Sequence, residues 1–510
     1  MLATCAAGVA LPTWLGRVLD PATALAAQAP LPAEYFAASF GLDDTALRRL
    51  LAAALGGGGD YADLYLQHTV GSWLVMEDGQ VNRAYTAVGL GLGVRVLQGE
   101  QTGYAFSQIL EMPELLATAR AAAALARAGK QAPGARGIEV VGPSFAASPD
   151  FYPMQKPWPQ AGAQARMDLL ARVETRLRKA DPAISKTLLQ LSDSVSRVLV
   201  LTSEGVKRAD LRPRSGLYAS AVAERNGRTE SGQQDLSARA GLEMYSPDAL
   251  DQLADVAAEN TMLQFEARPL PAGEMPVILA AGSAGILLHE AIGHGLEADF
   301  NRRGISTYAE RLGQKVAGPL VTVVDDGTIP GSHGAINFDD EGADSRRTVL
   351  VDKGKLVSFL HDRLSARWYK TASTGSGRRQ SYQHAPMPRM RATFMEPGPH
   401  DPAEILAAVK KGLYARQFTN GQVNIGAGDF SFFVKTGWAV ENGRKTHPVK
   451  DLNVVGNGPQ ALARITMVGH DLALATGGYM CGKLGQSVPV SQGLPTTLVS
   501  ALTVGGACDA

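Results

Sequence analysis

The residues best suited to chemistry form one short run, HEAIGH at residues 289–294, which has the pattern H-E-x-x-x-H. Imidazole nitrogens are common zinc ligands, and a glutamate beside a ligand can act as a general base. The pattern is one residue longer than the H-E-x-x-H found in many zinc proteases. It indicates metal-assisted hydrolysis, with His289 and His294 as candidate ligands and Glu290 as the candidate base.

The extra residue between the histidines sets a geometric condition. On a regular α-helix, positions i and i+5 diverge by roughly 140°, whereas i and i+4 diverge by about 40°. A π-bulge, which adds one residue to a turn, would return His289 and His294 to one face, and Gly293 would tolerate the distortion. The alternative is a regular helix whose histidines are merely hydrogen-bonded.

A catalytic two-histidine site needs a third protein ligand and an open position for water. Glu297, Asp299, the other histidines and the cysteines are all candidates. Cys481 lies in a glycine-flanked turn, GGYMCGK at residues 477–483, where a thiolate could approach a metal closely and Lys483 could favour the thiolate. The alternative role for Cys481 is that of a buried small hydrophobic residue.

The acid and base chemistry follows from the same run. Glu290 would take a proton from a water activated by zinc and later deliver it to the leaving amine. Six arginines could also grip a peptide carboxylate or polarise a carbonyl, although a solvated basic face is the simpler interpretation. They are Arg302, Arg303, Arg378, Arg379, Arg389 and Arg391.

A strand and a helix must position these residues. The apolar run at residues 276–281 predicts a buried strand, and residues 284–296 predict a helix with Ser283 as its N-cap. Both histidines would then lie on a helix at the edge of a core.

The rest of the chain predicts an α+β fold with two domains. Helices are expected at residues 43–55, 112–129 and 161–180, antiparallel hairpin strands at 61–70, 71–77 and 89–97, a connection at 131–159, and further strands at 188–223. A composition shift near residues 260–272 marks the boundary. We expect an N-terminal α+β domain at 36–265, with an antiparallel sheet and helices, and a strand-rich, glycine-rich metalloprotease domain at 266–510 that carries the metal-site helix.

Composition excludes several classes of function. The chain has 49 Lys+Arg and 49 Asp+Glu in 510 residues, so its formal net charge is zero. This argues against nucleic acid or an anionic membrane as a partner. Three cysteines cannot form a disulfide scaffold, and Cys5 and Cys508 are interpreted as incidental. Residues 1–35 are rich in Ala and Leu and predict either an export signal or an N-terminal extension.

Several further motifs accompany the metal run. They are YADLY at 61–65, EDG at 77–79, GLGVR at 91–95, HEAIGHGLE at 289–297, NRRG at 301–304, PMPRM at 386–390, VGNGP at 455–459 and CGK at 481–483. With these motifs the chain, from about residue 40 to its C-terminus, resembles the TldD/PmbA family of metalloproteases. The resemblance is to the TldD side, the subunit that bears the metal motif.

The resemblance implies a zinc site made by His289, His294 and Cys481, with Glu290 catalytic. It also implies two α+β domains and a dimer, either with a PmbA/TldE-like subunit that lacks the metal motif or with a second copy. The implied substrates are unfolded or extended peptides, bound by strand addition. Family members are typically cytoplasmic, whereas residues 1–29 would direct the chain to the periplasm if they are an export signal.

The leading hypothesis is therefore a zinc-dependent peptidase that hydrolyses unfolded or extended peptides. One alternative is a non-catalytic regulatory or binding subunit of a TldD/TldE-like complex. Another is a zinc amidohydrolase that acts on non-peptide amides by the same zinc-water chemistry. The intact motif argues against a non-catalytic subunit, because such a chain has no physical need for ligands beside a base.

Overall fold

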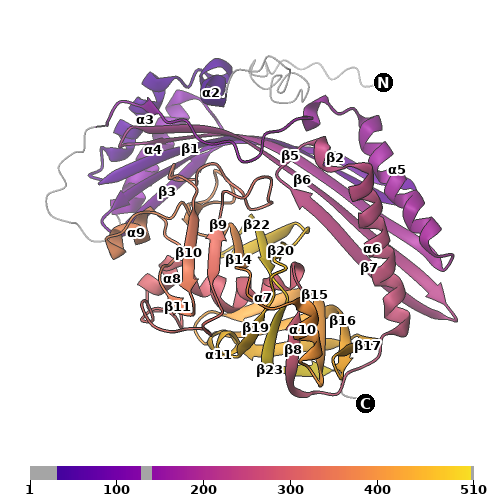
Figure 1. Ribbon diagram of the computed structural model, residues 1–510. Coiled ribbons are helices and arrows are strands. Elements are labelled where there is room, and N and C mark those ends of the chain that lie inside the picture. The colour runs from indigo at the N-terminus through magenta and orange to yellow at the C-terminus, as the bar shows by residue number, and fades with distance from the viewer. Residues whose placement is uncertain (1–31, 128–139, 507–510) are drawn as a thin grey trace.

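The computed structural model of the protein describes residues 32–127 and 140–506. The candidate export segment at 1–29, Cys5 and Cys508 lie outside these residues. The predicted α+β class is confirmed, since helices and several sheets alternate along the chain (Figure 1). Within the described residues, no helix is both long enough and apolar enough to cross a membrane.

The N-terminal part is one long, mainly antiparallel sheet. Its strands run in the order β3-β2-β1-β5-β6, and both β7 and β4 pair with β6. The strands are β1 (Tyr61–Glu77), β2 (Gln80–Gln98), β3 (Gln101–Ser107), β4 (Ser144–Phe145), β5 (Ile184–Thr202), β6 (Val206–Arg225) and β7 (Arg228–Ala238).

Helices cover one face of this sheet, on its outer side in Figure 1. They are α2 (Pro32–Phe40), α3 (Asp44–Leu55), α4 (Met112–Arg127), α5 (Ala163–Ala180) and α6 (Pro247–Glu266), with short 3-10 turns at Trp158–Gln160 and Leu242–Met244. Side chains alternate along a strand, so Leu64 and Leu66 pack under the helices. Tyr65, between them, faces the C-terminal part and packs with Phe338 and Tyr382.

One detail of this sheet differs from the prediction. Residues 61–70 and 71–77 were expected as separate strands, but they form the single strand β1. The turn at Glu77–Gly79 exists, and β2 begins directly after it, nine residues before the predicted strand. Residues 80–88 of β2 are exposed, so they lack the buried, alternating pattern by which a strand is recognised.

Two sheets form most of the C-terminal part. In one, β15-β8-β23-β18-β16 closes into a ring through the β15–β16 pairing, while β17 pairs with β16 and β19 with β23. These strands are β8 (Gly273–Leu279), β15 (Lys411–Asn424), β16 (Asp429–Glu441), β17 (Arg444–Val449), β18 (Leu452–Asn457), β19 (Ile465–Val468) and β23 (Thr497–Gly506).

The other sheet has the order β11-β10-β9-β14-β22-β20, with β21 paired to β22. Its strands are β9 (Val323–Asp326), β10 (Arg347–Asp352), β11 (Lys355–Leu356), β14 (Ala392–Met395), β20 (Ala473–Leu474), β21 (Tyr479–Lys483) and β22 (Gln486–Leu494). Short helices α8 (Ala298–Arg302), α9 (Arg363–Tyr369), α10 (Pro402–Ala407) and α11 (Gly458–Ala463), and the strand pair β12 (Gly377–Arg378) and β13 (Met387–Pro388), complete this part.

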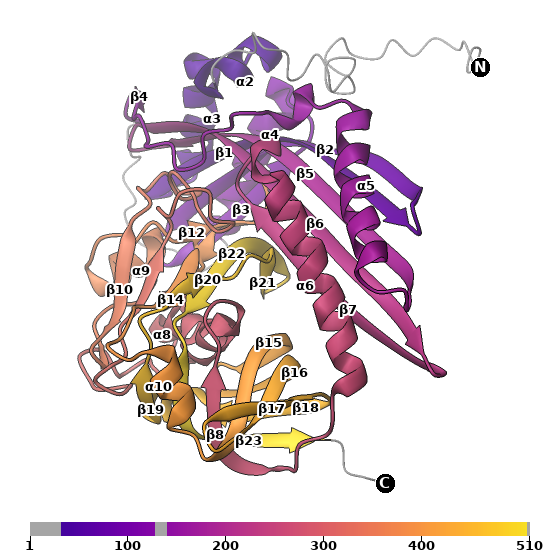
Figure 2. The ribbon, with the colours of Figure 1, turned by 45° about the vertical axis from the view of Figure 1, so that its right-hand side comes forward.

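The β21–β22 hairpin lies between the N-terminal sheet and the closed ring of strands (Figure 2). Backbone contacts support this placement, because the Ser237 amide in β7 donates to the Thr476 carbonyl at 2.8 Å. The helical segment 283–296 packs among the two C-terminal sheets, where Leu287, Leu288 and Ile292 are fully buried. The fold thus fixes Cys481 on a strand directly opposite the histidine-bearing helix.

Candidate metal centre

The helical segment that carries the histidines is irregular in the way that the residue spacing requires. It comprises a 3-10 turn at Ser283–Gly285, α7 (Ile286–Leu288), a π-helical turn at His289–Gly293 and a 3-10 turn at His294–Leu296. The His294 amide donates to the His289 carbonyl, five residues back, which is the π pattern. The π-bulge condition set by the sequence is therefore confirmed.

Close packing is a second reason, besides backbone tolerance, why position 293 requires glycine. A Cβ at Gly293 would collide with Sδ of the fully buried Met390.

The expected N-cap at Ser283 is wrong. Gly282, with a left-handed φ of 94°, precedes the helical segment, and the Ser283 hydroxyl donates instead to the Arg416 carbonyl at 2.9 Å.

Side chains supply hydrogen bonds to carbonyls that the irregular turns leave free. The Tyr308 hydroxyl donates to the Ala291 carbonyl at 3.0 Å. The Asn301 amide and the Ser306 hydroxyl both donate to the Gly295 carbonyl, at 2.8 and 2.6 Å. Because buried carbonyls without partners are costly, these three side chains stabilise the π turn and its exit.

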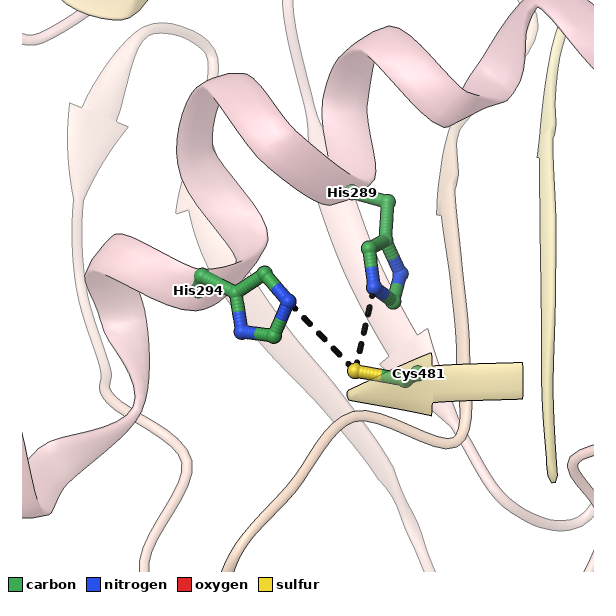
Figure 3. Close-up of side chains that lie close together, drawn as sticks. All are labelled: His289, His294 and Cys481. Carbon is green, nitrogen blue, oxygen red and sulfur yellow. Dashed lines mark hydrogen bonds between the residues drawn. The ribbon is translucent and has the colours of Figure 1, made fainter. Parts of the chain in front are cut away.

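The two imidazoles converge on one sulfur atom, as Figure 3 shows. His289 Nε2 lies 3.2 Å and His294 Nε2 3.4 Å from Cys481 Sγ, and the three donor atoms all lie within 4.8 Å of one another. All three side chains are buried. Zinc bonds of about 2.3 Å to sulfur and 2.0–2.1 Å to nitrogen, at tetrahedral angles, place sulfur and nitrogen roughly 3.5 Å apart. The donor set and its spacing therefore fit a zinc ion.

The charges of these groups also suit a cation. Burial alone would raise the pKa of the Cys481 thiol, but the neighbouring His289 and His294 outweigh it and bring that pKa well below its usual value. A thiolate is the form of cysteine that binds metals. From the sequence we expected Lys483 to favour the Cys481 thiolate. In the structure the Lys483 ammonium pairs instead with Asp299 at 2.7 Å and with Glu297 at 3.1 Å.

Glu297 was a candidate metal ligand, but its carboxylate is not among the three converging donor atoms. Its Oε2 lies 3.0 Å from His294 Nδ1, so this hydrogen bond fixes the ring with its other nitrogen, Nε2, toward Cys481. Burial would raise the pKa of Glu297, but Lys483 and His294 lower it to about 2. Glu297 thus stays ionised and orients His294, and Asp299 lies beyond it against Lys483.

Replacing Glu297 with glutamine is expected to weaken zinc binding by about 10- to 100-fold, because an amide holds the His294 tautomer less firmly than a carboxylate does. Competition with a chelator of known zinc affinity measures the change. Asp299→Asn, which alters a carboxylate that does not touch either histidine, is the matched control. Equal zinc affinities of the Glu297→Gln variant and the unaltered chain would contradict this role.

Glu290 faces a cavity of about 710 Å³ that also receives His289, His294 and Cys481. Burial raises the pKa of the Glu290 carboxyl above its ordinary value, with the two histidines opposing the shift. Residues 421–423 of β15 also line the cavity, next to Glu290, since a Cβ at Gly421 would approach the Glu290 side chain to 3.4 Å. The cavity has room for a substrate beside the base.

Two features of this cavity match no chemical motif in the sequence. The part of the wall that β15 supplies consists of Gly421, Gln422 and Val423, which match no motif. Gln492 of β22 is fully buried and lines the cavity, and both polar atoms of its amide have no hydrogen-bond partner among the described residues. A buried amide without partners is positioned to bind a polar group that enters the cavity.

The expectation of a solvated basic face is wrong for four of the six arginines. Arg378, Arg379, Arg389 and Arg391 are buried. Arg391 pairs with Asp325 at 2.7 Å, and Arg389 donates to the carbonyl of Cys481, so both are structural.

Family models match three stretches of the chain. Residues 272–506 match the PmbA/TldA metallopeptidase C-terminal domain, residues 156–265 its central domain and residues 62–126 its domain 1. The chain is 37% identical over 456 residues to a metalloprotease TldD homolog from Haemophilus influenzae, covering 88% of this chain and 93% of that protein. It is 31% identical over 293 residues to a zinc metalloprotease TldD homolog from Saccharolobus solfataricus, covering 57% and 65%.

Two solved structures share the fold. A putative modulator of a DNA gyrase from Thermotoga maritima has a TM-score of 0.73 and 22% identity, covering 91% of this chain and all of that one. TldE from Thermococcus kodakarensis has a TM-score of 0.70 and 16% identity, covering 90% of this chain and 100% of that one. At these identities the likeness concerns the fold alone.

Proposed function

The chain belongs to the PmbA/TldD family of metallopeptidases, and we propose that it is a zinc-dependent peptidase that hydrolyses unfolded or extended peptides. One observation carries the proposal. The donor atoms of His289, His294 and Cys481 converge at a π turn, beside the carboxylate of Glu290, in a cavity large enough for a peptide segment.

His289, His294 and Cys481 are proposed to hold the zinc ion, and one position would stay open toward the cavity. When bound, zinc lowers the pKa of a water and polarises a carbonyl oxygen. Glu290 takes the proton of the attacking water and returns it to the leaving amine. Its raised pKa suits both steps, because a carboxyl that titrates closer to neutral pH accepts and releases a proton more evenly.

The binding mode proposed for the substrate is strand addition. Within the described residues β21 pairs only with β22, so its other edge is open beside the metal centre. An extended peptide could form main-chain hydrogen bonds with that edge while its side chains face the cavity. Such binding recognises the main-chain hydrogen-bonding groups of the peptide rather than its side chains. It discriminates against folded proteins, because their strands are already paired.

We also propose that the chain acts with a TldE-like partner or as a homodimer. The support is the family membership and the fold that the chain shares with TldE.

The test is a comparison of substrates with the purified full-length chain, with zinc added and then removed by a chelator. Unstructured peptides should be hydrolysed, activity should disappear with the chelator and return with zinc, and small non-peptide amides should react at least about 100-fold more slowly, because they lack a main chain for strand addition. Faster turnover of the small amides would favour the amidohydrolase alternative. No turnover of any substrate by the zinc-loaded chain, alone or with a TldE-like partner, would contradict a catalytic role.

A further inference from the structure

A second cavity, of about 160 Å³, lies between the inner face of the N-terminal sheet and the β21–β22 hairpin. It is lined by Tyr65 and Thr69 of β1, by Ser194 and Ser196 of β5 and by Pro489 of β22. Most of its charged lining is basic. Five arginines contribute to it, namely Arg212, Arg214, Arg239, Arg378 and Arg379, against one carboxylate, Asp340.

Two of these arginines are neutralised. Arg212 pairs with Asp210 at 2.9 Å and with Asp340 at 2.5 Å. Arg379 pairs with Asp63 at 3.1 Å.

The other three, Arg214, Arg239 and Arg378, have no carboxylate within 4 Å among the described residues. Arg378 donates to the carbonyls of Met390 and Pro489, at 2.5 and 2.7 Å. Arg239 donates to the Pro213 carbonyl at 3.4 Å, and its Nε has no hydrogen-bond partner in the part of the chain that the structure describes. Arg214 contacts Met480 Sδ at 3.7 Å. Carbonyl oxygens satisfy hydrogen bonds but leave the three positive charges uncompensated.

Such an arrangement is expensive, because a buried charge needs a partner of opposite sign. Arg239 and Arg378 are only 6% and 3% exposed. Burial, reinforced by the neighbouring Arg239, lowers the pKa of Arg378 to about 9. Burial, together with Arg214 and Arg239, also lowers the pKa of the nearby His333 to about 3 and keeps it neutral. A bound anion would offset this repulsion.

The cavity adjoins the metal centre through one residue. Met480, which Arg214 contacts, precedes Cys481 and lines the metal cavity. Pro489, whose carbonyl accepts from Arg378, is the partner of Met480 across the hairpin. A peptide that leaves the metal cavity past Met480 would therefore meet the guanidinium groups, whose planar forks match a carboxylate.

We propose that the cavity lined by Arg214, Arg239 and Arg378 binds a carboxylate of the peptide substrate, either its C-terminal carboxylate or an Asp or Glu side chain. This inference rests on the proposed peptidase function. It adds a selection for acidic groups that strand addition by itself does not provide.

The test uses the full-length chain with the substitution Glu290→Gln, so that peptides are bound but not consumed. Calorimetry compares three hexapeptides of one uncharged sequence, namely the C-terminal amide, the free acid, and the amide with a single glutamate. At least one carboxylate peptide should bind about tenfold or more tightly than the neutral amide, as charge-assisted hydrogen bonds require. The free acid and the glutamate peptide distinguish the two sources of the carboxylate.

Adding Arg214→Gln should bring the three affinities within about twofold of each other. Arg239→Gln provides an independent second variant. Arg172→Gln, which removes an exposed ion pair between α5 and Asp251 of α6, is the control and should keep the full preference. Equal binding of the three peptides, or a preference that survives both cavity variants, would overturn the proposal.

Hydrolysis by the zinc-loaded native chain separates this inference from the function on which it rests. Equal hydrolysis of all three peptides, together with equal binding, would remove the carboxylate site and leave the peptidase. Binding preference without any hydrolysis would leave the site and remove the peptidase. Failure to bind any of the peptides would overturn both.

Discussion

Replacing Glu290 with glutamine is expected to lower the kcat for peptide hydrolysis by about 10²- to 10⁴-fold while leaving the zinc content unchanged. The amide has nearly the same shape as the carboxylate but cannot accept the proton of the attacking water. Glu290 lies beside His289 yet is absent from the converging donor set, so its loss should not release the metal. Peptide turnover and zinc content are measured on the same samples.

Glu224→Gln serves as the control, since Glu224 is an exposed glutamate at the far end of β6. It should keep both activity and zinc. Loss of zinc from Glu290→Gln would show that Glu290 supports the metal rather than the proton transfer. A kcat within about threefold of the unaltered chain would remove Glu290 as the base.

Replacing Cys481 with alanine is expected to weaken zinc binding by more than about 100-fold, beyond the range for a residue outside the ligand set, and to abolish peptide hydrolysis. The physical reason is the loss of the one anionic donor, since two neutral imidazoles offset little of the cation's charge. His289→Ala should behave in the same way. Zinc per chain after dialysis, with peptide turnover, measures both effects.

The matched control is Cys508→Ala, which removes a thiol outside the described residues and should retain zinc and activity. Full zinc occupancy in Cys481→Ala would exclude the cysteine from the ligand set.

Much of the candidate site follows from local sequence. The H-E-x-x-x-H spacing requires an irregular helix, and the π turn at His289–Gly293 meets that requirement with Gly293 in place. Flanking glycines drew attention to Cys481, but the predicted turn there is wrong, since Cys481 lies within strand β21, which carries it to the histidines. Periodicity and turn residues located α3, α4 and α5 and the strands β1, β2, β5, β6 and β8, because those signals are local in the chain, but they did not identify α6 or the individual strands β9 to β23.

Contacts between distant residues could not be predicted in this way. The sequence left Glu297 and Cys481 as competing ligands, and only the positions of Lys483 and His294 separate their roles. The arginines at 378 and 379 resemble a solvated basic pair, yet the N-terminal sheet covers them. Such burial depends on how two parts of the chain pack together, which no local pattern records.

X-ray absorption at the zinc edge of the purified chain tests the central claim most directly, because it counts the atoms around the metal. We predict one zinc per chain with a single sulfur at about 2.3 Å, two imidazole nitrogens at about 2.0–2.1 Å and one further light atom. A shell without sulfur, or one with a single imidazole, would contradict the site formed by His289, His294 and Cys481.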